Sequence, residues 1–203
     1  EYAKIIATTM TNMNYIFAQT YSLARGIKVF GDRGSKAAYD EMRQLHDRCV
    51  FKPININELS TIERRSMESL IFLTEKEDGT IKAQTCANGS TQGKYTRQDK
   101  AASPTALTES HLITAVIDAK QKREVMTADI LNAFVQTDMI NKNDEEKTIM
   151  KIRGTLVDML VNINPMIYKD YVLYEGKNKI LYVEMKKALY GMLQSSLLYY
   201  MKF

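Results

Sequence analysis

Two strand–turn–strand segments constrain the fold of this chain more than any other feature of its sequence. In the first, the β-prone run 70–73 leads to Asp78-Gly79, a dipeptide typical of hairpin turns, and residues 80–86 can return as the partner strand. Residues 171–185 repeat this arrangement around Gly176-Lys177-Asn178, and the alternation over 180–185 predicts that one face is buried. The chain is therefore expected to contain antiparallel strand pairs.

Helix-like segments stand between and around these hairpins. Apolar residues at three- or four-residue spacing and capping signals predict five of them: residues 35–49, a short helix after the Ser60–Glu63 capping box, one after Ser103-Pro104, residues 154–163 before Asn164-Pro165, and one from Ser195. The third carries an apolar stripe of Leu112, Ile113, Val116 and Ile117. Single strands are expected at 125–129 and 148–152, whereas residues 1–34 show no firm period. Helices and strands separated in this way predict an α+β fold.

Composition narrows the class of protein without indicating a function. The chain has 203 residues, 45% of them hydrophobic, which suits one domain or one and a part. It has neither an apolar run near the ~20 residues of a membrane helix nor a signal-peptide pattern, so we expect a soluble, intracellular protein. Two cysteines and two histidines give no disulfide framework or zinc site. The net charge of +4 permits a polyanionic partner without requiring one.

Asp129 is the candidate for chemistry that depends on metal ions. It is expected at the end of the strand 125–129, immediately before a turn into residues 130–134. Two-metal phosphoryl transfer needs several carboxylates around cations roughly 4 Å apart, and one aspartate cannot supply them. Considered without any family, Asp129 is better explained as a turn or helix-capping residue. Pattern alone therefore leads no further than an α+β intracellular domain.

Three sequence blocks stand in an order that resembles a known family. Residues 127–134, Thr-Ala-Asp-Ile-Leu-Asn-Ala-Phe, are similar to the Asp-Val-Lys-Thr-Ala-Phe block of Ty1/copia-type retrotransposon reverse transcriptases. Residues 181–195 resemble that family's Lys-x-Leu-Tyr-Gly-Leu-Lys-Gln-Ser block. Residues 78–92 resemble its fingers segment, Asp-Gly-x-x-Lys-Ala-Arg followed by Gly-x-x-Gln. The resemblance divides the chain into a lead-in segment, 1–35, and a partial reverse transcriptase domain, 36–203.

The resemblance implies the fingers and the first part of the palm of a right-hand polymerase, which copies RNA or DNA into DNA. The implied partners are a primed RNA or DNA template, deoxyribonucleoside triphosphates and the rest of the Pol polyprotein, with its integrase and RNase H. Two Mg²⁺ ions are the implied cofactors. The implied location is a cytoplasmic virus-like particle or the nucleus. In-line phosphoryl transfer relies on cations and needs no covalent protein nucleophile.

Specific roles follow for the residues of the central block. Asp129 is implied to be the first catalytic carboxylate and a metal ligand, and the carbonyl of Ile130 completes that side of the metal site. Backbone N–H groups near Asn132 and Ala133 would cradle the incoming triphosphate. Phe134 would lie under the sugar as the steric gate that excludes a 2′-hydroxyl group.

The two outer blocks supply the remaining implied contacts. Lys82 would reach the triphosphate from the fingers hairpin, and residue 84 would act beside it on the same face of the strand. Tyr190, Gly191 and Ser195 would line the surface that holds the nucleotide and the template.

The sequence departs from the family at three places. Gln84 replaces the usual fingers arginine, and Leu193-Gln194-Ser195-Ser196 replaces Lys-Gln-Ser-Pro, so that two cations are lost. The Tyr-x-Asp-Asp strand, which supplies the remaining carboxylates, would lie beyond Phe203, so we expect the 203-residue chain to be inactive alone. Because the chain starts at Glu1 and stops within a helix-like run, both ends are expected to be cuts in a longer polypeptide. Two alternatives stay open: a decayed or domesticated fragment that only binds nucleic acid or a protein, and an unrelated α+β scaffold with chance matches.

Overall fold

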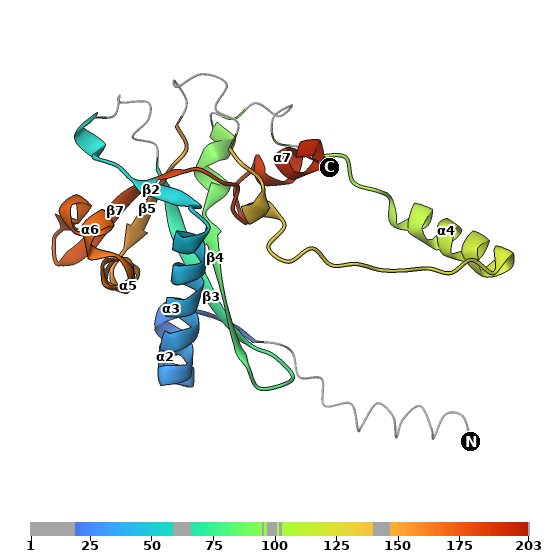
Figure 1. The fold of residues 1–203 in the computed structure, drawn as a ribbon, viewed down its shortest axis with the longest axis horizontal. Coiled ribbons are helices and arrows are strands. Elements are labelled where there is room, and N and C mark those ends of the chain that lie inside the picture. The colour runs from blue at the N-terminus through green and yellow to red at the C-terminus, as the bar shows by residue number, and fades with distance from the viewer. Residues whose placement is uncertain are drawn as a thin grey trace. The chain divides into compact units, whose positions relative to one another are not determined.

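Helices and strands are mixed irregularly along the chain (Figure 1), and the sheet contains both parallel and antiparallel pairs. This agrees with the predicted α+β class. The computed structural model describes residues 19–58, 66–94, 96, 101, 103–139 and 147–202. The chain divides into two units, residues 1–40 with 71–84, and residues 41–70 with 85–203. The predicted Ser60–Glu63 capping box lies outside the described residues.

The first unit begins with β1 (Thr20–Ser22) and α2 (Leu23–Phe30). Strand β1 pairs antiparallel with β3 (Met67–Glu75), where Tyr21 stands opposite Leu73. Gly26 of α2 lies over Leu73 so closely that an added Cβ would be 2.5 Å from its Cδ1 atom. The missing side chain therefore lets the helix approach the sheet. Residues 20–30, whose sequence shows no firm period, thus form regular structure through a contact that is distant in sequence.

The predicted hairpin at residues 70–86 is confirmed. Strand β4 (Ile81–Ala87) pairs with β3, and Gly79 turns the chain with φ at +77°. The carboxylate of Asp78 accepts bonds from the hydroxyl of Thr80 at 2.6 Å and from its backbone N–H at 2.9 Å. These bonds lower the pKa of Asp78. The turn is thus stabilised by its own residues.

The helix predicted at 35–49 is α3 (Asp32–Asp47), which begins three residues earlier and passes from the first unit into the second. Its predicted apolar residues Ala38, Met42 and Leu45 are all buried. Cys49 was wrongly included in this stripe. It lies after the helix, exposed, with φ at 54°, because the chain turns there toward β2 (Phe51–Pro53).

Strand β7 (Asn178–Met185) organises the sheet of the second unit. It pairs antiparallel with β2, with β5 (Ile149–Arg153) and with β6 (Leu173–Glu175). The start of β3 adds a parallel pair to β5. The predicted strand at 148–152 and the hairpin at 171–185 are thereby confirmed, with Gly176 at the turn in a positive φ of +62°. Leu181, Val183 and Met185 are fully buried, as the alternation predicted.

Two consecutive helices follow β5 in this unit. The predicted helix at 154–163 is α5 (Thr155–Ile163), which Asn164-Pro165 ends as expected. The same dipeptide starts α6 (Pro165–Tyr168), since the Asn164 side chain accepts a bond from the N–H of Ile167. The remaining short helices are η1 (Ile56–Glu58), η2 (Gly89–Lys94), η4 (Phe134–Gln136) and η5 (Lys169–Tyr171).

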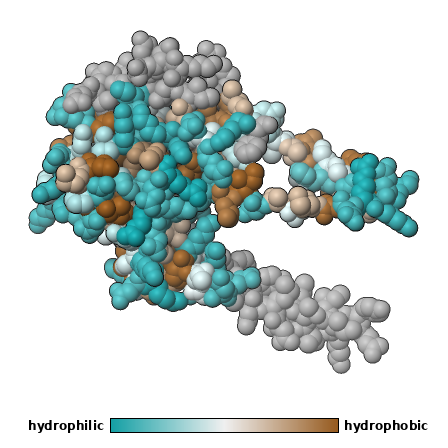
Figure 2. All heavy atoms as spheres, in the orientation of Figure 1, coloured by the Kyte–Doolittle hydropathy of each residue, from teal (hydrophilic) through white to brown (hydrophobic). Residues whose placement is uncertain are grey.

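Helix α4 (Thr108–Gln121) differs from its prediction in two respects. It begins four residues after Pro104 rather than at it. Its apolar stripe is exposed instead of packed, with Leu112, Ile113 and Val116 all more than 60% accessible, and Figure 2 shows hydrophobic residues at the surface of this helix. The stripe therefore does not belong to the core of the second unit.

The strand predicted at 125–129 is wrong. Residues 123–130 have no regular structure and are all exposed. A β-prone run becomes a strand only where another strand can exchange backbone hydrogen bonds with it, and no strand in the described part of the chain pairs with these residues.

The last predicted helix is confirmed as α7 (Ser195–Lys202). Within the parts of the chain that the structure describes, no helix is long and apolar enough to cross a membrane.

Candidate functional site

A tight turn at residues 131–136 presents Phe134. Asn132 adopts a φ of 53°, a left-handed conformation that asparagine tolerates better than most residues. Val135 is buried and fixes the turn to the core. The N–H of Thr137 donates to the carbonyl of Phe134 at 2.8 Å and closes the turn. Backbone geometry therefore sets the direction in which the Phe134 ring projects.

The chain after this turn is bonded to the segment that follows β7. The N–H of Ala188 donates to the carbonyl of Thr137 at 2.8 Å, and the N–H of Met139 donates to the carbonyl of Lys186 at 2.9 Å. Two sequence blocks that are far apart in the chain are thereby held side by side.

Aromatic rings gather where these blocks meet. The Phe134 ring lies 4.7 Å from that of Tyr190, centroid to centroid, at an interplanar angle of 63°. It lies 5.8 Å from that of Tyr199 at 88°. Both pairs have the edge-to-face geometry that aromatic quadrupoles favour.

These rings border an open hollow of about 510 Å³ in the second unit. Tyr200 is the fourth aromatic residue of its wall, and the other lining residues are Ser103, Pro104, Ala133 and Ser196. None of these lining residues, all from the described part of the chain, carries a charge. Of the predicted site residues, the structure brings Ala133, Phe134 and Tyr190 together here.

Gly191 has a structural role beside this hollow. Its φ is +84°, and a Cβ added to it would lie 2.1 Å from the carbonyl oxygen of Ala87. The carbonyl of the preceding Tyr190 accepts a bond from the N–H of Ala87 at 2.7 Å. A Cβ on Gly89 would lie 2.2 Å from the carbonyl oxygen of Gly191. The backbone around residues 87–89 and the backbone at residue 191 therefore approach so closely that both Gly89 and Gly191 must lack a side chain.

Gln92 and Ser195 complete the same junction. The buried Gln92 side chain accepts a bond from the N–H of Leu193 at 2.9 Å. The Ser195 hydroxyl is buried and donates to the carbonyl of Leu189 at 2.6 Å. Ser195 thus fixes the start of α7, and its neighbour Ser196 lines the hollow in its place.

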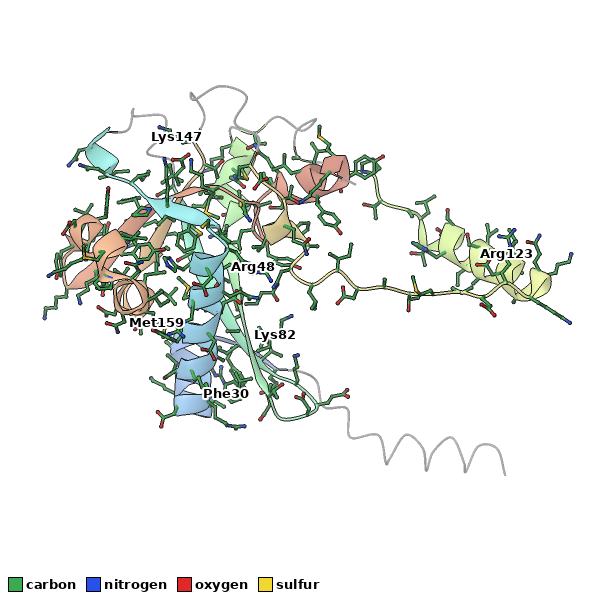
Figure 3. All side chains as sticks on the ribbon, viewed as in Figure 1. Phe30, Arg48, Lys82, Arg123, Lys147 and Met159 are labelled. Atoms are coloured by element: carbon green, nitrogen blue, oxygen red, sulfur yellow. The ribbon has the colours of Figure 1, made fainter. Side chains whose placement is uncertain are left out.

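Lys82 and Gln84 lie on β4 in the first unit, whereas the other predicted site residues lie in the second. Lys82 is exposed and Gln84 half-exposed, while the intervening Ala83 is buried. Their side chains therefore share the outer face of the strand, as the spacing predicted. Figure 3 shows Lys82 on the β3–β4 hairpin.

Asp129 and Ile130 stand apart from the hollow's wall, on the exposed segment 123–130. In the described ranges, no three His, Cys, Asp or Glu side chains are grouped so that they could hold a metal ion. A pair of Mg²⁺ ions needs several oxygen ligands, so the donor set present here does not by itself fit a two-metal site.

A buried carboxylate lies on β7, close to the segment that holds Phe134 in place. Glu184 is 2% exposed and is bonded by the ammonium groups of Lys186 and of Lys52, the latter at 3.2 Å. Burial acts to raise the pKa of Glu184, but the bonds from the two lysines outweigh it and lower the pKa. The sequence alternation placed residue 184 on the other face of the strand from Leu181, Val183 and Met185. Both faces of β7 are covered at this point.

A second polar pair, which is partly buried, lies near the end of α3. The hydroxyl of Tyr168 and Nδ1 of His46 lie 2.7 Å apart. Burial, with a smaller contribution from Cys49, raises the pKa of Tyr168 to about 12. His46 is therefore engaged in packing and hydrogen bonding.

Tyr199 and Tyr200 line the hollow but were not among the predicted site residues. The sequence contained one indication of this position. Tyr199 and Tyr200 follow Ser196 by three and four residues, which places the three side chains on one face of a helix. Ser103 and Pro104 gave no comparable signal.

Comparison with models of protein families finds no match to this chain, and searches of curated proteins and of solved structures also find none.

Proposed function

We propose that the chain is part of an RNA-directed DNA polymerase of the Ty1/copia type, and that the hollow beside Phe134 and Tyr190 is part of its nucleotide site. One observation carries the proposal. The motif resemblance assigns these two residues, from separate blocks, to the same bound nucleotide, and their rings lie 4.7 Å apart. Chance matches to two motifs would not by themselves bring the two side chains into contact.

The side chains of this chain would contribute binding and selection. The Phe134 ring, held at its edge by Tyr190 and Tyr199, would exclude a 2′-hydroxyl group by its volume. Divalent cations supply charge stabilisation in this class of reaction. In this proposal Asp129 gives one ligand, and further carboxylates are needed to hold two cations.

A second candidate is a protein that binds nucleic acid without catalysis. It is favoured by the position of Asp129 on an exposed segment without a strand partner, and by the uncharged Gln84 where the family has arginine. In this candidate function the aromatic hollow still binds nucleic acid, but the chain takes no part in nucleotidyl transfer.

Primer extension by the full-length polypeptide that contains these residues separates the two candidates. With Mg²⁺ and a primed RNA or DNA template, the proposal expects extension that Asp129→Asn abolishes. Asp138→Asn is the matched control, because Asp138 is an exposed carboxylate nine positions along the chain with no assigned role. The 203-residue chain alone is expected to extend no primer.

Each other outcome has a definite meaning. Extension that survives Asp129→Asn would contradict the assignment of that carboxylate. A full-length polypeptide that binds the template but never extends the primer would favour the second candidate.

A further inference from the structure

The hollow in the second unit contains more aromatic surface than the motif resemblance assigns to it. Besides Phe134 and Tyr190, it is lined by Tyr199 and Tyr200, which project from one face of α7. Tyr200 is 55% exposed, so its ring is the part of the wall most open to a ligand. The volume of the hollow, about 510 Å³, lies in the usual range for small-molecule sites, about 300–1,000 Å³.

The rings are arranged in a way that leaves room for another planar group. Phe134 meets Tyr190 at 63° and Tyr199 at 88°, so neither pair is stacked face to face. An edge-to-face pair covers one face of one ring, so the exposed Tyr200 is a ring on which a nucleobase can stack, as nucleobases do on aromatic side chains.

The charges around the hollow indicate which end of a ligand enters. Among the described residues that line the hollow none is charged, and this part of its wall does not suit a phosphate group. Lys202, at the end of α7, donates a bond to the carbonyl of Gln136, two residues after Phe134. A cation thus stands close to the aromatic wall, where it can pair with a phosphate that remains outside.

We propose that this hollow binds a nucleobase by stacking against Tyr199 and Tyr200, with the attached phosphate directed toward Lys202. The hydroxyl groups of Ser103 and Ser196 supply hydrogen bonds for the edge of the base. A nucleotide uses both the hydroxyl groups and the cation. The proposal rests on the proposed function for its class of ligand and adds the residues that hold the base, which is provided by a free nucleotide or by an unpaired strand.

The absence of tryptophan from the sequence allows a direct optical test. Tyr200→Trp introduces a single tryptophan at the hollow, whose emission can be excited apart from that of the tyrosines. A base that stacks on it should quench this emission. Tyr174→Trp is the matched control, because Tyr174 is 68% exposed on β6 and does not line the hollow. The 203-residue chain is titrated with dATP, with a single-stranded oligodeoxythymidylate and with inorganic tripolyphosphate.

The proposal expects saturable quenching in Tyr200→Trp by dATP, by the oligonucleotide or by both, and none by tripolyphosphate. Quenching by the oligonucleotide alone assigns the base to a strand, and quenching by dATP assigns it to a free nucleotide. Adding Tyr199→Ala to the reporter should weaken binding roughly 5- to 100-fold, the loss expected for one stacked base. Tyr199→Phe should restore it.

Equal quenching by tripolyphosphate, or equal quenching in the Tyr174→Trp control, would overturn the proposal, and so would no quenching at all. These results are independent of primer extension. Extension that Asp129→Asn abolishes, without quenching, leaves the polymerase proposal standing and refutes the base site. Quenching without extension retains the base site and refutes the polymerase.

Discussion

The substitution of Gly191 by alanine should destabilise the protein more than the same substitution at a turn glycine that has no neighbouring atoms near the added Cβ. A residue other than glycine at a φ of +84° is strained by about 1–2 kcal/mol. The added Cβ would also lie 2.1 Å from the carbonyl oxygen of Ala87. Relief of that overlap requires the backbone to separate, which breaks the 2.7 Å bond from Ala87 to Tyr190. A buried group left without its partner costs about 1–3 kcal/mol, so the total is about 2–5 kcal/mol.

Two other glycines separate these contributions. Gly176 has a φ of +62° with nothing within 4 Å of an added Cβ, so Gly176→Ala should cost only the strain, about 1–2 kcal/mol. Gly89 has no positive φ, but its Cβ would lie 2.2 Å from the carbonyl oxygen of Gly191. Gly89→Ala should therefore cost about 1–3 kcal/mol through the overlap alone.

Urea unfolding followed by far-ultraviolet circular dichroism measures all three variants. Gly191→Ala should have the lowest midpoint, roughly 0.3–3 M below that of Gly176→Ala for a typical dependence on urea. If Gly191→Ala and Gly176→Ala unfold at the same midpoint, the close backbone approach between the two motif blocks does not exist as described.

Four further substitutions test other parts of the structure by urea unfolding. Because burial raises the pKa of Tyr168 to about 12, its neutral hydroxyl stabilises the fold fully below pH 10. Up to about 3 kcal/mol of the free energy of unfolding should be lost between pH 10 and 12. Tyr168→Phe should remove this pH dependence, and a variant with the wild-type pH profile would contradict the role of Tyr168. Glu184→Gln should cost about 1–3 kcal/mol at pH 7. Since the pKa of Glu184 is lowered, that difference should shrink below pH 4.5, and a difference independent of pH would be inconsistent with the ion pairs. Val116→Ser on exposed α4 should change stability by less than about 0.5 kcal/mol, whereas Val157→Ser in buried α5 should cost several times more.

The elements that sequence predicted well are those with local signals. The hairpins at Gly79 and Gly176 were found because their turns use residues and conformations set within a few positions. Helix α5 was bounded by Asn164-Pro165 for the same reason. Local signals place such elements but do not state what they pack against.

The elements that sequence predicted poorly depend on distant contacts. Strand β1 and helix α2 are ordered by Leu73, about fifty residues later in the chain. The run at 125–129 had the residues of a strand but has no strand beside it. The alternation along β7 predicted an exposed residue 184, but Glu184 is buried. Its ion pairs come from another strand and from the segment after β7, which the sequence of β7 does not indicate.

The candidate site was only partly accessible from sequence for the same reason. The motif resemblance selected Phe134 and Tyr190, which lie together. It also selected Gly191 and Ser195, whose observed contacts are with the backbone of Ala87 and of Leu189. Some residues of such a motif therefore line the hollow, and others hold the backbone segments that support it. Only a structure distinguishes the lining residues from the supporting ones.

The selectivity of the full-length polypeptide between nucleotides tests the central proposal most directly. Steady-state incorporation of a ribonucleotide and of the matching deoxyribonucleotide is compared for the wild type and for Phe134→Val on one primed template. If the Phe134 ring lies under the sugar, the smaller side chain should raise the ratio of ribonucleotide to deoxyribonucleotide incorporation. An unchanged ratio, together with lower stability in urea, would mean that Phe134 serves packing alone and that the nucleotide site lies elsewhere.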